Sequence, residues 1–245
     1  MSTAVFRFYE ELNDFLPPGR RKVQFPYEFT GTASVKFAIE ALGVPHSEVD
    51  MILVNGEPVD FSYKLKEGDM ISVYPVFESL DISNPVHLRE RPLRDPKFVL
   101  DVHLGKLAGY LRFCGFDSIY RNDLEDNEIV DIGEKESRTI LTRDLDLLKN
   151  KRITRGYRIR SSEPVIQLKE VITRLDLKKS ITLFARCMEC NGELKNIEKE
   201  KILHLLEPKT KIYFNNFRIC ASCSKIYWQG SHYLKMLNTI EMILK

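Results

Sequence analysis

The stretch Thr139-Ile-Leu-Thr-Arg-Asp144-Leu-Asp146 decides the fold of the central part of this chain. A short apolar run rich in β-branched residues ends in two aspartates, and Phe98-Val-Leu-Asp101 repeats the pattern with one aspartate. Short apolar runs bounded by polar residues are typical of buried strands. Because parallel α/β sheets hold their functional sites at the carboxyl ends of the strands, we expect these carboxylates to converge.

Carboxylates that lie close together repel one another, and a divalent cation relieves the repulsion. Mg²⁺ and Mn²⁺ prefer such oxygen ligands, and a bound ion of this kind can activate water against a phosphodiester. Each aspartate taken alone fits an N-cap or a loop position, where Asp is a favoured residue. The joint pattern favours a metal or phosphate site.

The surrounding sequence predicts alternating strands and helices. Strands are expected at 97–100, 117–120 and 139–142, and helices from about 104 to 114 and from 127 to 136. The first helix carries an apolar stripe that ends in Cys114, which we interpret as a core residue. Segments 157–160 and 165–177 add a further strand and a closing helix. This order predicts a parallel sheet with right-handed crossovers.

The first 82 residues predict a separate module in which two strands precede a helix and further strands follow it. Its strands are expected at 4–9, 21–29, 51–54, 57–61 and 70–74, with an Asn55-Gly56 hairpin turn and a helix at 34–42. This order resembles a ubiquitin-like β-grasp, including the ending of sulfur carriers at Gly68–Pro75. Sulfur carriers end in a free Gly-Gly, whereas here the chain continues through Val76-Phe-Glu-Ser-Leu-Asp81. We therefore expect a scaffolding role or a protein partner for this module rather than sulfur transfer.

Composition and charge argue against a membrane or secreted protein and favour one that acts on nucleic acid. The chain has 245 residues, 43% of them hydrophobic and 29% charged, and no apolar run approaches the ~20 residues that span a bilayer. The N-terminus lacks the pattern of a secretory signal, so a cytoplasmic protein without a membrane partner is expected. Residues 1–86 carry 7 basic and 13 acidic residues, a net of −6, and residues 87–245 carry 30 and 22, a net of +8. A basic part that holds clustered aspartates suits an enzyme acting on nucleic acid.

Two C-x-x-C pairs near the C-terminus predict a metal site. Cys187-Met-Glu-Cys190 and Cys220-Ala-Ser-Cys223 are separated by 29 residues. Two such knuckles complete a tetrahedral Cys₄ zinc site, which has no open position and is therefore structural. A redox dithiol is the alternative, but the βαβ pattern of thioredoxins does not adjoin the pairs. The following cluster, with Trp228 and His232, suits either base stacking or packing of the ribbon.

These motifs together resemble the Mut7-C RNase family. The stretch Asp101-Val-His-Leu-Gly-Lys-Leu-Ala-Gly-Tyr-Leu-Arg-Phe-Cys-Gly-Phe-Asp117 is similar to its opening motif, Leu141-Thr-Arg-Asp144 to its L-T-R-D strand, and the paired knuckles followed by Y-W-x-G-S-H to its zinc ribbon. The N-terminal module resembles the ubiquitin-like domain found in front of it. The resemblance implies a PIN-like nuclease that hydrolyses RNA with Mg²⁺ or Mn²⁺.

The resemblance also implies roles for individual residues. Asp101, Asp126 and Asp144 would hold the catalytic metal, with Asp146 beside them; Asp123 and Glu125 compete with Asp126 for the loop position. The residues expected to contact RNA are Lys106, Arg112, Arg143, Trp228 and His232. Arg112 has a second interpretation, as an ion-pair partner of Asp117.

The sequence thus predicts an α/β chain of three parts: a ubiquitin-like β-grasp at 1–82, a linker at 83–96, a PIN-like α/β/α domain with a parallel sheet at 97–180, and a Cys₄ zinc ribbon at 181–245. The expected function is a metal-dependent ribonuclease with a structural zinc ribbon that aids RNA binding. The alternative is a non-catalytic RNA-binding adaptor with a degenerate PIN-like core.

Overall fold

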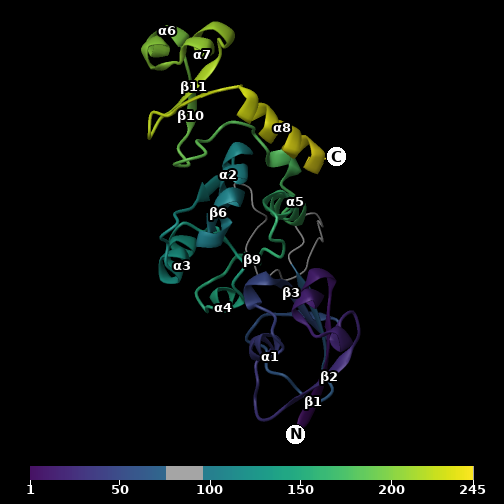
Figure 1. The fold of residues 1–245 in the computed structure, drawn as a ribbon. Coiled ribbons are helices and arrows are strands. Elements are labelled where there is room, and N and C mark those ends of the chain that lie inside the picture. Colours follow the sequence, from purple (N-terminus) through teal and green to yellow (C-terminus); the bar gives the residue numbers. More distant parts are fainter. Residues whose placement is uncertain (76–95, 245) are drawn as a thin grey trace. The chain divides into compact units, whose positions relative to one another are not determined.

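The computed structural model in Figure 1 describes residues 1–75 and 96–244. The expected linker up to residue 95 and the continuation Val76–Asp81 lie outside the described residues. The described residues divide into two compact units, one made of residues 1–75 and 126–158 and the other of residues 96–125 and 159–244. The described residues form a mixed α/β fold, which confirms the predicted fold class.

The N-terminal sheet contains β1 (Ser2–Phe8), β2 (Phe25–Phe29), β3 (Val49–Val54), β4 (Glu57–Val59) and β5 (Met70–Pro75). The strand order is β2-β1-β5-β3-β4, with β1 and β5 parallel and the other pairs antiparallel. Helix α1 (Val35–Ala41) begins after Ser34, whose hydroxyl accepts a hydrogen bond from Phe37 N at 3.2 Å. The short helix η3 (His46–Glu48) leads into β3. This is the β-grasp order that the sequence predicted.

The connection between β1 and β2 differs from the prediction. Two short 3₁₀ helices, η1 (Glu10–Phe15) and η2 (Pro18–Arg20), lie there, and β2 begins at Phe25 rather than Arg21. The buried Asn13 side chain explains the difference, because its amide donates to Phe8 O at 2.9 Å and its carbonyl oxygen accepts from Lys22 N at 2.6 Å. A side chain thus replaces strand pairing over these residues.

The second sheet contains β6 (Lys97–Leu100), β7 (Asp117–Ile119), β8 (Thr139–Thr142) and β9 (Gly156–Arg158), in the order β7-β6-β8-β9. The β6–β7 and β8–β9 pairs are parallel, as predicted. All four residues of β8 are buried, as are the last three of β6. Burial of consecutive residues is typical of a parallel sheet, whose faces are both covered.

Helices follow the strands of this sheet in the expected order. They are η4 (Val102–Leu104), α2 (Gly105–Phe113), α3 (Asp126–Lys135), α4 (Leu145–Leu148) and α5 (Pro164–Arg174), with η5 (Lys178–Ser180) after them. The apolar stripe of α2 is buried as predicted, with Leu107, Leu111 and Cys114 inaccessible to solvent. Burial raises the pKa of the Cys114 thiol to about 12, so this cysteine is a protonated core residue at neutral pH.

The C-terminal part forms a small antiparallel sheet of β10 (Leu194–Ile197), β11 (Phe217–Cys220) and β12 (Ile226–Trp228). The segment between the two cysteine pairs also holds α6 (Lys199–Ile202), η6 (Leu203–Leu205) and α7 (Pro208–Tyr213). Ile202, Leu206 and Phe217 form a core of their own beneath them. The last helix, α8 (Ser231–Leu244), contacts α5. Among the described residues, none of the helices has the length and apolar character needed to cross a membrane.

Candidate functional site

The four paired cysteines come together at one point. The sulfur atoms of Cys187, Cys190, Cys220 and Cys223 all lie within 4.8 Å of one another. Cys187 Sγ and Cys223 Sγ are 3.6 Å apart, and Cys190 Sγ and Cys220 Sγ are 3.4 Å apart. A tetrahedral zinc with bonds of about 2.3 Å places its sulfur ligands about 3.8 Å apart. These distances far exceed a disulfide bond, so the cluster fits a single metal ion such as zinc.

The backbone of each knuckle is folded to present its sulfur atoms. In the first knuckle, Cys187 N donates to Gly192 O at 2.7 Å, and Asn191, with φ of +67°, turns the chain between them. In the second, the N–H groups of Ser222 and Cys223 both point at Cys220 Sγ at 3.4 Å. A Cβ atom added to Gly192 would lie 2.9 Å from that same sulfur, so the close approach of the two knuckles requires glycine there.

The thiols of the cluster differ in acidity. Burial raises the pKa of Cys220, but the hydrogen bonds from Cys223 N and Ser222 N and from neighbouring thiols outweigh it, so its pKa lies at about 6. Burial raises the pKa of Cys190 to about 12. A cation of charge +2 beside these thiols would favour their ionised forms.

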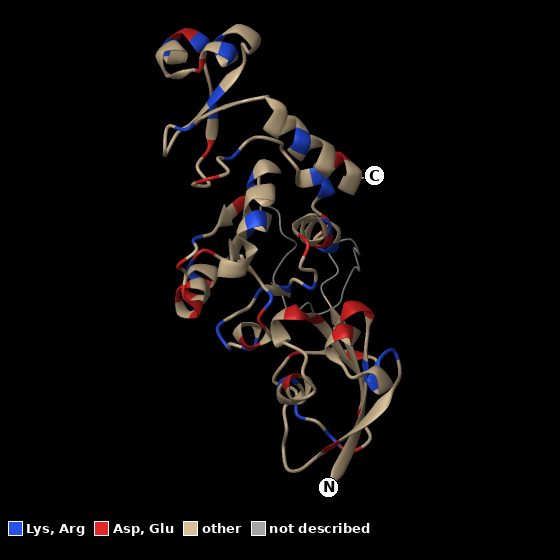
Figure 2. Cartoon of the chain, viewed as in Figure 1, with Lys and Arg blue, Asp and Glu red and all other residues tan. Residues whose placement is uncertain are grey.

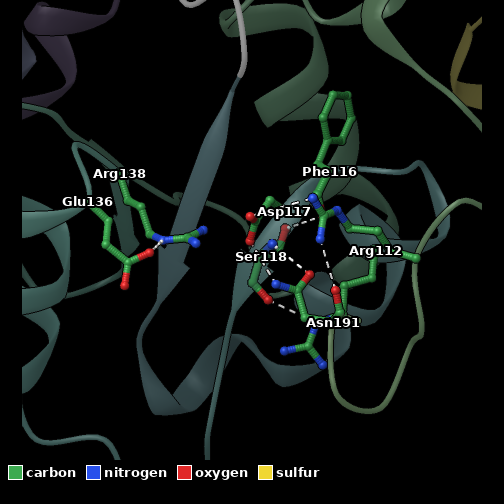
Figure 3. Close-up of polar contacts among 8 residues, drawn as sticks. Arg112, Phe116, Asp117, Ser118, Glu136, Arg138 and Asn191 are labelled. Carbon is green, nitrogen blue, oxygen red and sulfur yellow. Dashed lines mark hydrogen bonds and ion pairs between the residues drawn. The ribbon is translucent and has the colours of Figure 1, made fainter. Parts of the chain in front are cut away.

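A buried arginine joins the first knuckle to helix α2 (Figure 3). Arg112 is only 4% exposed. Its guanidinium donates to Met188 O at 3.0 Å and Glu189 O at 2.8 Å in the knuckle, and to Ser118 O at 2.9 Å and Tyr120 O at 3.4 Å around β7. These contacts give Arg112 a structural role between the first knuckle and β7, and its contact with RNA stays a prediction.

The charge of Arg112 also faces the cysteine cluster. Burial lowers the pKa of Arg112, while the neighbouring Cys187, Cys190, Glu189 and Asp117 act in the opposite direction. An arginine side chain stays protonated in proteins, so its positive charge stabilises the thiolates beside it.

Asn191 forms a second link between the knuckle and β7. Its side-chain oxygen accepts from Ser118 N at 2.9 Å, and its side-chain nitrogen donates to Asp117 Oδ1 at 2.7 Å (Figure 3). Arg186 lies 3.5 Å from the other oxygen of Asp117. Sequence reasoning missed this role of Asn191, and the only signal available was its place between a knuckle cysteine and a glycine.

Three of the predicted acidic residues lie at the starts of helices. Asp101 is the N-cap of η4 and accepts from His103 N at 2.8 Å; it is 5% exposed. Asp144 is the N-cap of α4 and accepts from Asp146 N at 2.7 Å. Asp126 is the first residue of α3, along which further acidic residues gather (Figure 2).

The exposure and ion pairs of the acidic residues show whether they are close enough to share a metal ion. Asp144 and Asp126 are exposed, and Asp146 forms an ion pair with Lys149 at 2.9 Å. Asp123, one of the competing loop residues, lies 3.2 Å from Arg121. In the ranges that the structure describes, the cysteine cluster is the one group of three or more potential ligands close enough to share an ion. The acidic metal site therefore stays a prediction.

The remaining residues predicted to contact RNA divide into two kinds. Lys106, Arg143 and His232 are exposed. Trp228 is half-buried, with its ring centroid 6.3 Å from that of Phe214 and 6.4 Å from that of Phe217. These contacts agree with the second interpretation of Trp228, in which its ring packs within the ribbon.

Comparisons with known proteins agree with the motifs. Residues 96–240 match the family described as "Mut7-C RNAse domain", and residues 1–81 match "Mut7-C ubiquitin". A search of curated proteins found no match. Among solved structures, the chain is similar to small archaeal modifier protein 1 of H. volcanii, with 19% identity over 31% of this chain and 98% of that chain and a TM-score of 0.25. The RNase domain match spans more than half of the sequence. The chain therefore belongs to the Mut7-C RNAse domain family and carries a Mut7-C ubiquitin domain in front of it, as the sequence resemblance predicted.

Proposed function

We propose that this protein is a metal-dependent ribonuclease whose carboxylates lie at the ends of β6 and β8. The match of residues 96–240 to the Mut7-C RNAse domain carries this proposal, and it points to a ribonuclease in general. The finer statement, hydrolysis with Mg²⁺ or Mn²⁺, rests on the donor set. Aspartates follow both strands, and β6 and β8 are neighbours in the strand order.

The carboxylate oxygens of Asp101, Asp126 and Asp144 are of the chemical type that Mg²⁺ and Mn²⁺ prefer, so the residues fit such an ion. When bound, the ion would lower the pKa of a water molecule and stabilise negative charge at phosphorus. The chain supplies the orientation. One oxygen of Asp101 accepts from His103 N and one of Asp144 accepts from Asp146 N, and these hydrogen bonds orient the two carboxylates.

RNA would be held by cations and an aromatic ring. Lys106 lies in the first turn of α2, five residues after Asp101, and Arg143 directly precedes Asp144, so both suit contacts with phosphates next to the carboxylates. Trp228 and His232 of the ribbon are proposed to contact bases or phosphates farther along the strand.

The cysteine cluster is proposed to hold a structural zinc ion. Four thiolates fill a tetrahedral shell, which leaves no position for water or substrate. The contacts of Arg112 and Asn191 with the first knuckle support a role in fixing the ribbon to α2 and β7. The ribbon then aids RNA binding because the metal keeps its surface in place.

Incubation of the purified full chain with labelled RNA and Mn²⁺ tests the proposal. Cleavage is expected in the wild type and a loss of about 100-fold or more in Asp144→Asn. Because asparagine is itself a good N-cap, this variant changes the charge and keeps the start of α4. Asp131→Asn, at a side chain that is 45% exposed and pairs with Arg152, is the matched control and should cleave as the wild type does. Cleavage that survives Asp144→Asn would overturn the carboxylate mechanism.

A non-catalytic RNA-binding adaptor is the second candidate. It is favoured by one observation, that the aspartates do not form a three-ligand group among the described residues. An adaptor would bind labelled RNA with equal affinity in the wild type and in Asp144→Asn, and neither would cleave it at any Mn²⁺ concentration.

A further inference from the structure

A run of polar residues in the β-grasp domain is buried. His46, Ser47 and Glu48 of η3 are 5%, 0% and 3% exposed, and Asp50 at the start of β3 is 5% exposed. Polar side chains are rarely buried in proteins unless they have hydrogen-bond partners. The hydrogen-bond partners of these side chains therefore indicate the structural role of η3.

Each side chain of η3 bonds to a backbone group of residues 148–158, which run from the last residue of α4 to the last residue of β9. His46 Nε2 lies 3.0 Å from Ile153 O, and Ser47 Oγ donates to Leu148 O at 3.0 Å. Glu48 Oε1 accepts from Arg158 N at 2.6 Å. The β-grasp residues and the segment 126–158 belong to the same compact unit. Three successive side chains thus satisfy three backbone groups of one distant segment.

The packing at this contact is tight. A Cβ atom added to Gly156 would lie 2.5 Å from Leu148 Cδ2 and 3.1 Å from Ser47 Oγ, so there is no room for a side chain at this position. The guanidinium of Arg158 lies 5.8 Å from the centre of the Phe15 ring in η1, a cation–π distance. The β-grasp domain therefore contacts β9 through close packing as well as through hydrogen bonds.

This contact reaches the acidic residues through a short helix. Leu148, whose carbonyl accepts from Ser47, is the last residue of α4, and Asp144 is the N-cap of the same helix. At 1.5 Å per residue, four residues span about 6 Å. Ser47 also satisfies a carbonyl at the end of a helix, where no partner exists within the helix. The β-grasp domain thus contacts the last residue of α4, and Asp144 lies at the start of the same helix.

We propose that η3 of the ubiquitin-like domain is a brace for the α4–β9 segment, and that Ser47 and Glu48 are positioning residues for Asp144. The domain is then a fixed component of the nuclease, in addition to any partner that it binds elsewhere. The brace follows from the contacts alone, and its effect on catalysis rests on the proposed function.

Hydrogen exchange of the full chain, followed by mass spectrometry, tests the brace. Glu48→Ala leaves Arg158 N without its acceptor, and we expect the amides of residues 144–158 to exchange about tenfold faster. Glu48→Gln keeps an acceptor oxygen and should restore the slow exchange. Glu57→Ala, at an exposed position of β4, is the matched control and should leave exchange in this segment unchanged.

The exchange pattern distinguishes a local effect on residues 144–158 from a loss of stability of the whole unit. Faster exchange confined to 144–158, with β1 and β5 still protected, supports the brace. If Glu48→Ala instead loosens the whole unit, Ser47→Ala, which removes one hydroxyl, gives the deciding measurement. Unchanged exchange of residues 144–158 in both Ser47→Ala and Glu48→Ala overturns the proposal.

The positioning role has its own readout. In Glu48→Ala we expect kcat on labelled RNA to fall about tenfold with KM changed less than about twofold, because a displaced carboxylate affects the reaction more than binding. Glu48→Gln should restore kcat. A rise in KM with unchanged kcat would contradict positioning. If the wild type cleaves no RNA, the proposed function fails, while the exchange measurement still decides the brace.

Discussion

Replacing Arg112 by alanine should destabilise the ribbon and the nuclease domain together. The guanidinium is 4% exposed and donates to four backbone carbonyls, two in the first knuckle and two around β7. A hydrogen bond from a charged donor contributes about 1.5–3 kcal/mol, but contributions from one side chain do not add fully. We expect the free energy of unfolding to fall by about 3–5 kcal/mol, near the upper end for a single substitution.

Urea denaturation of the zinc-loaded chain measures this loss. Arg121→Ala is the matched control, because the Arg121 side chain is 55% exposed and forms an ion pair with Asp123, whose side chain is 73% exposed; its effect should stay within about 0.5 kcal/mol. Competition with a chelator provides a second measurement. Loss of the positive charge beside Cys187 and Cys190 should let the chelator remove zinc at about tenfold lower concentration.

Two results would refute this reasoning. A loss below about 1 kcal/mol would mean that water replaces the guanidinium at little cost, contrary to its burial. Unchanged zinc retention with a large loss of stability would mean that Arg112 supports α2 and β7 but leaves the metal site unaffected.

Other predictions follow from single residues. Cys187→Ser, or chelation of the wild type, should unfold the ribbon, seen as lost near-ultraviolet circular dichroism, and metal analysis of the intact chain should give about one zinc per chain. Alkylation after chelation should label the four paired cysteines and spare Cys114, whose burial raises its pKa to about 12, until the protein is denatured; early labelling of Cys114 would contradict its place in the core. Gly115→Ala should cost at least about 2 kcal/mol in thermal or urea denaturation, because φ is +93° and the new Cβ would meet the backbone carbonyl of Thr182.

Local patterns in the sequence predicted most of the fold. The run 139–142 is β8 to the residue, because four buried positions in a row leave a clear apolar signal. The stripe that ends at Cys114 likewise predicted the buried face of α2, since its spacing follows from helix geometry. The start of β2 was misplaced because the Asn13 side chain, nine residues away from Lys22, occupies the backbone that strand pairing would have used.

The candidate site was predicted less completely, and distance along the chain explains why. The cysteine cluster was predicted because each knuckle is a local motif with its own spacing. The contacts of Arg112 with the knuckle were not predicted, because its carbonyl partners at Met188 and Glu189 lie more than 70 residues away and nothing near Arg112 in sequence indicates them. The run His46–Glu48 looked like an ordinary polar turn, since its burial depends on a segment about 100 residues later.

The order β7-β6-β8-β9 leaves β7 and β9 as the outer strands of the sheet. Outer strands expose unpaired N–H and C=O groups that can recruit another chain into an aggregate. Here a backbone N–H of each outer strand donates to a side chain: Ser118 N to Asn191 of the zinc knuckle, and Arg158 N to Glu48 of the β-grasp. We therefore expect the two accessory modules to protect these outer strands against self-association as well. A nuclease core produced without these modules would expose β7 and β9 to other molecules of the same protein.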